Sequence, residues 1–359
     1  IVKLQFSANG HYQNSAYGTT IYNATQHIGF AQMTLNKNFR SSDLLLGIAY
    51  RYTLYDDNTP ATSGRNQPNE IHLPGIFIQN EIKINELNKL LLGLRYDYNS
   101  IHGNILTPRL NYKWNSSDKK NIFRISAGNG FRVANIFTED HAALTGARSV
   151  EFEGELNPEK SWNVNLNFVK KNYFTNGFFL GIDSSVFYTY FNNRILPDYD
   201  TDPNKIIYGN LEGYSVSKGI SLNLDMLWIS GLKILAGATL MDVSVNENGE
   251  RFRQLLTESF QSTWGISYEL TSIGLAIDYT GNLYGPMRLP LLGKLDPRPE
   301  YSPWWSIQNI QLTKTFSNQW EIYGGIKNLL DFTPDSSSIA RPYDPFDQNV
   351  VFGNDGQVI

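Results

Sequence analysis

The sequence predicts an all-β protein, a transmembrane antiparallel β-barrel, and three observations carry this prediction. Apolar and polar residues alternate in about fifteen segments, which is the period-two pattern of strands. The connections between these segments alternate between short turns and long loops. No apolar run approaches the ~18 residues that a spanning helix needs, whereas a strand of a membrane barrel needs only ~10 alternating residues.

The composition of the 359-residue chain narrows the class of protein further. Aromatic residues make up 13% of a chain whose mean hydropathy is −0.34, an unusual pairing for a tightly packed soluble domain. There is no cysteine, so a disulfide framework and a thiolate metal site are excluded. The net charge of −4 and the lack of a basic run argue against binding to nucleic acid.

The clearest stretch runs from Ile122 to Phe168 and predicts a strand, a long polar loop and a second strand. In the second strand one face carries only apolar residues and the opposite face carries serine and asparagines. One face therefore prefers apolar surroundings and the other prefers water, and we expect the same asymmetry in every strand of a membrane barrel.

Alternation in order along the chain predicts the other strands. The strands up to the long loop are expected at 1–17, 26–35, 44–54, 76–84, 90–98, 106–114 and 122–132. Those after it are expected at 161–168, 178–190, 217–228, 232–240, 264–270, 273–279, 306–316 and 320–329.

Connections of two lengths separate these strands, as in bacterial outer-membrane barrels, where short turns lie on one rim and long loops on the other. Short turns are expected near Asn88, Asp118, Asn172, Gly231, Ser272 and Ser317, and long loops near Asn58, Ala142, Asp200, Asn248 and Pro290. Interfacial aromatic girdles are expected at strand ends, at Trp114, Trp162, Trp228, Tyr98, Tyr190 and Tyr279.

Charged residues are nearly absent from the apolar faces, and this separates a membrane barrel from a soluble sandwich, whose outer face should carry lysine and glutamate. A charge facing lipid at mid-bilayer costs roughly 2–4 kcal/mol, so its exclusion from so many strands is informative. Charged residues on the opposite, inward face are expected to form ion pairs in the lumen: Arg51, Arg95, Asp97, Arg109 and Asp183.

Several short boxes resemble the barrel of TonB-dependent outer-membrane receptors. Gly130-Phe131-Arg132-Val133-Ala134-Asn135 and Leu156-Asn157-Pro158-Glu159-Lys160-Ser161 are similar to the two boxes that bracket one extracellular loop in that family. Gly325-Ile326-Lys327-Asn328-Leu329-Leu330-Asp331 resembles the box of its penultimate strand, and Gly219-Ile220-Ser221-Leu222 resembles another strand motif. The segments 107–109 and 138–148 resemble the Bacteroidetes branch.

The resemblance implies that residues 1–359 are a portion of a 22-stranded barrel, without the N-terminal plug, the first strands and the closing strand. The fifteen predicted strands would be the seventh to the twenty-first. Such a piece would leave two open edges, which lipid does not tolerate, so a portion of a larger receptor is expected, either truncated or incomplete.

The function that the resemblance implies is active uptake of a scarce ligand, such as an iron-siderophore chelate, through the outer loops. The implied partners are outer-membrane lipid, the TonB-ExbB-ExbD complex through an N-terminal part, and the small-molecule ligand, and a surface lipoprotein is left open as a further partner. No cofactor, resident metal or nucleic acid is implied. Haem, cobalamin and glycans are alternative substrates, and a passive porin or adhesin is an alternative function.

Ligand-binding candidates come from the loops. His141 lies between the two boxes, where haem receptors of the family carry a ligand, although a structural role in the loop fits better. Arg132 and Arg148 could bind an anionic chelate, because guanidinium pairs with carboxylate or phosphate in bidentate fashion, or could order the loop through acidic neighbours. Trp304 and Trp305 could stack a planar ligand or belong to a girdle.

Two other classes are less consistent with the sequence. An enzyme of this fold needs a histidine paired with a nucleophile or carboxylate, and none of the five histidines stands in such an arrangement, so no catalytic residue is assigned. A soluble all-β binding protein would need no detergent. Residues 51, 95, 97, 109 and 183 are expected to contact the plug as well as each other.

Overall fold

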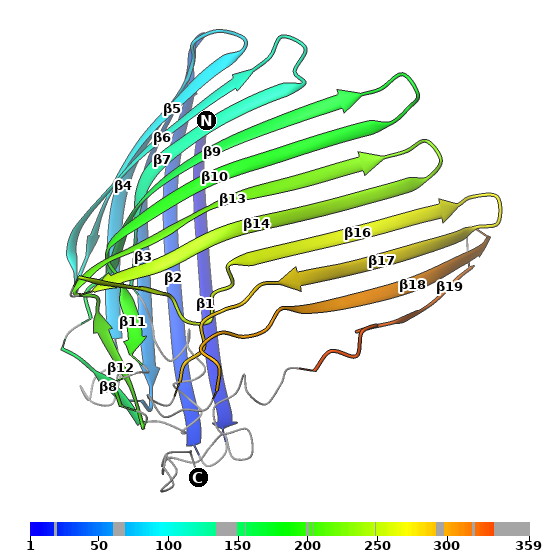
Figure 1. Ribbon diagram of the computed structural model, residues 1–359. Coiled ribbons are helices and arrows are strands. Elements are labelled where there is room, and N and C mark those ends of the chain that lie inside the picture. The colour runs from blue at the N-terminus through cyan, green and yellow to red at the C-terminus, as the bar shows by residue number, and fades with distance from the viewer. Residues whose placement is uncertain are drawn as a thin grey trace, which may run out of the picture.

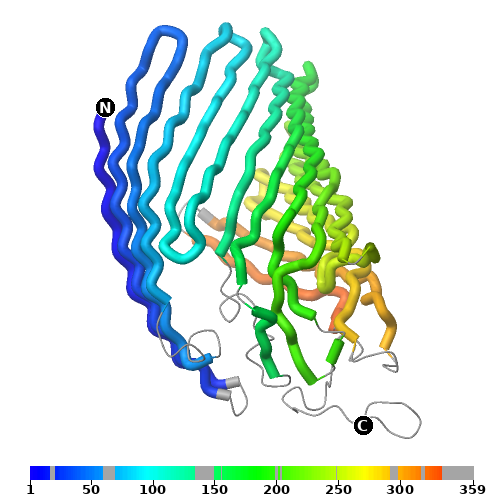
Figure 2. Tube along the Cα trace, turned by 90° about the vertical axis from the view of Figure 1, so that its left-hand side faces the viewer, coloured from blue at the N-terminus to red at the C-terminus, as the bar shows by residue number. Residues whose placement is uncertain are grey.

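The computed structural model describes residues 1–17, 20–59, 69–133, 149–154, 156–198, 201–202, 204–247, 249–291, 298–317 and 320–333. The fold over these residues is all-β, with one sixteen-stranded sheet and one three-stranded sheet. The large sheet curves into a wall, with its N-terminal strands at one side and its C-terminal strands at the other (Figures 1 and 2). No helix among these residues is long and apolar enough to span a membrane.

Fifteen strands follow one another along the large sheet, each antiparallel to its neighbours. They are β1 (Val2–Tyr17), β2 (Thr20–Asn38), β3 (Ser42–Asp57), β4 (Asn69–Lys83), β5 (Asn88–Asn99), β6 (Gly103–Asn115), β7 (Asn121–Arg132), β9 (Glu159–Tyr173), β10 (Phe179–Asn193), β13 (Gly213–Leu227), β14 (Leu232–Glu247), β16 (Phe260–Leu270), β17 (Leu275–Tyr284), β18 (Trp305–Ser317) and β19 (Trp320–Ile326). β15 (Glu250–Arg253) pairs only with β14. The order has no crossover, so neighbours in sequence are neighbours in the sheet.

The fifteen predicted strands are confirmed, each by one of these strands. The last ends earlier than expected, at Ile326 instead of residue 329. Asn328 and Asp331 have positive φ angles of 52° and 49°, which strands do not contain, and Asn328 also bonds to the backbone of Phe332 through its side chain. The family-like box at residues 325–331 is therefore the end of a strand and the turn after it.

The register of the sheet separates two faces. Val186 lies opposite Leu166 on one side and Ile220 on the other, and Ile220 lies opposite Leu240. Because side chains alternate across a strand, these residues share one face, here called the apolar face. The opposite, polar face carries Asn167 and the other asparagines and charges. Closure of such a wall in lipid requires the apolar face outside and the polar face toward the lumen.

The apolar face is bare of protein contacts to an extent that a soluble protein avoids. Large side chains at mid-strand are exposed there, including Ile48 at 52%, Ile76 at 58% and Ile220 at 56%. Exposed apolar patches much beyond a few hundred Å² mark surfaces that another apolar phase covers. Lipid is that phase for a transmembrane barrel.

The two ends of the wall differ as predicted. Tight connections at 39–41, 84–87, 116–120, 174–178, 228–231, 271–274 and 318–319 form one end, here the short-turn rim. The other end, the loop rim, carries the long connections 58–68, 133–158, 194–212, 248–259 and 285–304, together with short ones at 18–19 and 100–102 (Figure 1).

The strands β8 (Ser149–Phe152), β11 (Ile195–Asp198) and β12 (Lys205–Asn210) form the three-stranded sheet at the loop rim, here the loop sheet. β11 and β12 are antiparallel, whereas β8 runs parallel to β12 from a different loop. The sequence does not predict these strands, because each is four to six residues long and the β8–β12 pair joins segments more than 50 residues apart.

Candidate ligand-binding site at the loop rim

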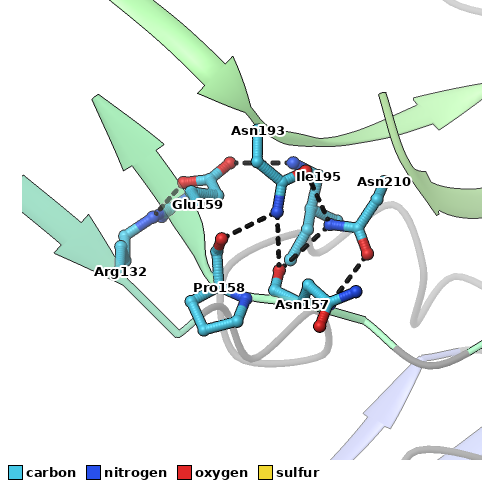
Figure 3. Close-up of polar contacts among 7 residues, drawn as sticks. All are labelled: Arg132, Asn157, Pro158, Glu159, Asn193, Ile195 and Asn210. Atoms are coloured by element: carbon cyan, nitrogen blue, oxygen red, sulfur yellow. Dashed lines mark hydrogen bonds and ion pairs between the residues drawn. The ribbon is translucent and has the colours of Figure 1, made fainter. Parts of the chain in front are cut away.

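The base of the longest described loop connection is closed by a single cross-strand pair. Arg132 ends β7, Glu159 begins β9, and the two residues lie directly opposite each other in the register. Arg132 Nε donates to Glu159 Oε2 at 2.7 Å (Figure 3). The two family-like boxes therefore meet in space at the point where residues 133–158 leave the wall and return.

Glu159 ties the wall to the loop sheet. Its second oxygen, Oε1, accepts a hydrogen bond from the backbone N–H of Ile195 at 3.1 Å, and Ile195 is the first residue of β11 (Figure 3). The Glu159 side chain is 5% exposed, whereas that of Arg132 is 55% exposed. The carboxylate thus has a structural role, and the guanidinium keeps a surface that a ligand can reach.

Three asparagines close the same junction from the other side. The Asn210 side chain bonds both ways with the backbone of Asn157, accepting from its N–H at 2.7 Å and donating to its carbonyl at 3.0 Å. Asn193 Nδ2 donates to the carbonyl of Pro158 at 2.7 Å, and Asn210 Nδ2 donates to Asn193 Oδ1 at 3.1 Å (Figure 3). Amides satisfy the backbone polar groups where the chain leaves the ladder.

A second guanidinium lies beside this carboxylate. Burial lowers the pKa of Arg194 from its ordinary value; the charge of Glu159 opposes that shift and the charge of Arg132 adds to it. Arg194 still remains protonated at neutral pH because an arginine starts above 12. Its guanidinium lies 5.0 Å from the Phe191 ring centre and donates to Ser215 Oγ at 3.0 Å. Two cations therefore share one carboxylate, and the junction has a positive excess.

The loop sheet packs into the mouth of the wall. Ile195, Ile206 and Tyr208 of the loop sheet form a buried cluster with Tyr22 of β2 and Tyr55 of β3. The register places Tyr22 and Tyr55 on the polar face, so the loop sheet lies against the lumen side of the wall. This contact joins β10–β13 connections to strands far along the sheet.

The hydroxyl groups of this cluster form a chain that ends on a carboxylate. Tyr22 Oη and Tyr55 Oη lie 2.8 Å apart, and Tyr55 Oη donates to Asp57 Oδ2 at 2.7 Å. Thr59 donates to the other oxygen, Asp57 Oδ1, through both its backbone N–H and its hydroxyl. Buried polar groups beside an apolar cluster are thereby paired, which fixes the loop sheet in one position.

Trp304 and Trp305 are adjacent but lie on opposite faces. Trp305 stacks on Tyr284 with ring centres 4.1 Å apart, and on Phe332 at 5.6 Å, and the register puts it on the polar face. Trp304 is 55% exposed and contacts Phe260, whose partner Leu240 belongs to the apolar face. The two tryptophans thus meet different surroundings, lumen in one case and lipid interface in the other.

The predicted lumen residues all lie on the polar face, in different surroundings. Arg95 binds Asp97 in bidentate fashion, at 2.7 Å from Nε and 2.6 Å from Nη2. Asp183 accepts from Asn167 Nδ2 at 2.6 Å. Arg51 and Arg109 are exposed and have no ion pair within the described part of the chain.

His141 and Arg148 lie outside the described residues, so their place at the loop rim stays a prediction. Within the described ranges no group of three or more histidine, aspartate or glutamate side chains is arranged to hold a metal ion. The residues that sequence reasoning missed are Glu159 as the partner of Arg132, the asparagines of the junction, and Tyr284 and Phe332. Glu159 could have been found from its place at the start of a strand that pairs with the one ending at Arg132.

Comparison with known proteins agrees with this architecture. The sequence model of the family described as "TonB dependent receptor-like, beta-barrel" matches residues 2–329. None of the curated proteins matches the chain significantly.

Solved structures share the fold at low sequence identity. The siderophore receptor PirA from Pseudomonas aeruginosa is 16% identical with a TM-score of 0.65, over 92% of this chain and 61% of that one. A variant of the ferric enterobactin receptor PfeA from the same organism, in complex with enterobactin, is 16% identical with a TM-score of 0.66, over 92% and 54%. The copper transporter OprC is 10% identical with a TM-score of 0.69, over 93% and 57%.

The chain spans between 54% and 61% of the lengths of these three proteins. Its assignment to the Bacteroidetes branch stays a prediction. The family match over nearly the whole chain, and the sheet with its two faces and two rims, lead to one conclusion: the chain belongs to the TonB-dependent receptors, as part of their β-barrel, and is a bacterial outer-membrane protein.

Proposed function

We propose that the protein forms the wall of a receptor that binds a scarce small molecule at its loop rim, an iron-siderophore chelate or a similar compound, and imports it with energy from TonB. The observation that carries this proposal is the loop sheet packed into the mouth against Tyr22 and Tyr55. A solute arriving at the loop rim meets a fixed protein surface there instead of an open pore. Family membership supports the same reading.

Positive charge at the junction supports an anionic ligand. Arg132 keeps more than half of its side chain exposed while its Nε is held by Glu159, and Arg194 adds a second positive charge beside that carboxylate. A guanidinium held at one nitrogen still offers further donors to a carboxylate or phenolate oxygen. We propose Arg132, with Arg148 and His141 from the adjoining 134–148 segment, as ligand contacts.

Trp305 is proposed as an aromatic platform for the ligand, because its ring is stacked and oriented by Tyr284 and Phe332 on the lumen side. Stacking on an aromatic ring contributes about 0.5–1.5 kcal/mol, which is up to about tenfold in affinity. Trp304 faces the other way and is proposed as an interfacial anchor. The two neighbours form a matched pair for mutagenesis.

The experiment uses the full-length receptor in detergent, titrated with ferric catecholate and hydroxamate siderophores. Trp305→Ala is expected to weaken binding about tenfold, and Trp304→Ala is expected to leave binding unchanged. Equal affinities for both variants and the unsubstituted receptor would remove Trp305 from the site. Binding of haem in place of either chelate would instead favour a haem receptor and a role for His141.

A second experiment tests the loop as a whole. Replacement of residues 133–155 with a short Gly/Ser linker is expected to leave a folded barrel and abolish uptake, because ligand contacts concentrate on loops held by a rigid scaffold. Folding is checked by the shift in gel mobility between unheated and heated samples. Unchanged uptake with this variant would overturn the assignment of the loop.

The import step needs groups on the lumen side. Arg51 and Arg109 are exposed on the polar face, without an ion pair to other described residues, and are proposed to contact a plug together with Arg95, Asp97 and Asp183. Coupling to TonB-ExbB-ExbD would pass through that plug. A passive porin would instead admit many small solutes without TonB.

A further inference from the structure

We propose that a cationic groove on the apolar face, beside the β14–β15 hairpin, binds the phosphate of an anionic lipid in the outer leaflet of the membrane. The groove has a volume of about 720 Å³. Its lining includes Lys218, Ile220, Leu240, Asp242, Arg251 and Arg253. The site is separate from the loop-rim site, because Lys218, Ile220 and Leu240 lie on the lipid side of the wall.

Charge in this groove is unbalanced. Asp242 is the one carboxylate in the lining, against three cations. It pairs closely with Arg251, and Lys218 Nζ lies 3.7 Å from the same oxygen. Arg253 donates to the carbonyl of Met241 at 3.2 Å, a contact that satisfies a hydrogen bond without neutralising charge. An anion is therefore needed to balance the groove, and a phosphate suits a cluster of lysine and arginine.

The depth of the cluster fits a headgroup. About nine residues of β13 separate Lys218 from the short-turn rim, which at ~3.3 Å per residue and a tilt of ~40° is a height of ~23 Å. The apolar band of such barrels is ~25 Å tall. Lys218 is thus expected to leave the strand face at the outer edge of that band, where a cation on the lipid side is tolerated.

Neighbouring aromatic residues place the boundary at the same level. Tyr188 lies directly opposite Lys218 in the register, and Phe260 lies opposite Leu240 and contacts Trp304. Tyrosine and tryptophan gather at membrane-water interfaces.

Apolar surface directly below the charges completes the fit. Ile220 is 56% exposed and Leu240 is 61% exposed, and the two lie opposite each other on the lipid side. A lipid would lay its acyl chain along these residues and its phosphate among Lys218, Arg251 and Arg253. A free phosphate ion would use only the upper half of the groove, so the two ligands are separable by experiment.

The test uses the full-length receptor in neutral detergent, titrated with the diphosphorylated glycolipid lipid A and with phosphatidylcholine, with bound lipid counted by native mass spectrometry. Lipid A is expected to bind and phosphatidylcholine is not. The Lys218→Gln/Arg253→Gln double variant keeps the Arg251–Asp242 pair that holds the hairpin. It is expected to weaken lipid A binding about 25-fold, because each cation at an anionic surface contributes roughly a fivefold factor.

Two further variants separate a lipid site from an ion-pair cluster that only ties the hairpin to the wall. Asp242→Asn removes the competing carboxylate and should bind lipid A at least as tightly as the unsubstituted receptor. Arg109→Gln/Lys113→Gln removes two cations from the polar face and should change nothing. Equal binding of both lipids, unaltered binding by the first double variant, weaker binding by Asp242→Asn, or displacement by millimolar inorganic phosphate would each overturn the proposal.

Discussion

Removal of the Glu159 carboxylate should release the loop sheet while leaving the wall folded. In Glu159→Ala the buried N–H of Ile195 loses its acceptor, which costs about 1–3 kcal/mol. The bond to Arg132 adds at most about 1 kcal/mol, because more than half of that side chain is exposed and regains water. A local loss of about 2 kcal/mol predicts roughly 30-fold faster opening of the loop sheet.

Glu159→Gln separates the two contributions. The amide keeps a carbonyl oxygen for the Ile195 N–H and loses only the charge that faces Arg132, so opening should accelerate no more than about fivefold. Hydrogen–deuterium exchange of peptides covering residues 195–210 in the detergent-solubilised full-length receptor measures both rates. Asp183→Asn is the control, since that carboxylate lies on the same face and bonds Asn167. Identical exchange in Glu159→Ala and the unsubstituted receptor would refute the reasoning.

Two other predictions concern the wall itself. A Cβ at Gly75 would lie 2.1 Å from Asp97 Oδ1, which Arg95 holds in place, so Gly75→Ala should destabilise the barrel by about 1–3 kcal/mol in thermal melts. Gly93→Ala, whose nearest neighbour is 3.7 Å away, should be neutral, and equal melting of both variants would contradict this account. In the 116–120 turn the Ser116 hydroxyl, and then the Lys120 N–H, lower the pKa of Asp118. The stability that this gives the turn is present above the carboxyl's ordinary value near 3.9 and lost as pH falls through the lowered value. Ser116→Ala should raise the Asp118 pKa measured by NMR titration, and an unchanged pKa would argue against the hydroxyl as its cause.

The strands of the wall are predictable because each has one apolar and one polar face, and because antiparallel neighbours follow each other in sequence. The alternation in 161–168 places Trp162 and Asn163 on opposite faces, and the register agrees with it. The loop sheet is not predictable in this way. Its strands are short, and β8 pairs with β12 through a contact that no local pattern encodes.

The site could be predicted only in part. The two boxes indicate the loop that Arg132 and Glu159 close, but the acidic partner expected for Arg132 was a loop residue, and the partner in the structure is Glu159. Trp304 and Trp305 were treated together from sequence, whereas strand geometry separates adjacent residues onto different faces. The stack on Phe332 depends on a turn after β19 that reverses the chain, and such tertiary contacts have no signal in a strand pattern.

Energised import is the central claim, and growth rescue tests it most directly. The full-length receptor is expressed in a strain that lacks its own uptake systems and is supplied with one ligand at a time: ferric siderophores, haem, cobalamin, then glycans. The account predicts rescue by one ligand, a ferric siderophore or a similar chelate, that disappears when TonB is deleted. Rescue that persists without TonB, or passage of many unrelated small solutes, would contradict it and indicate a passive porin.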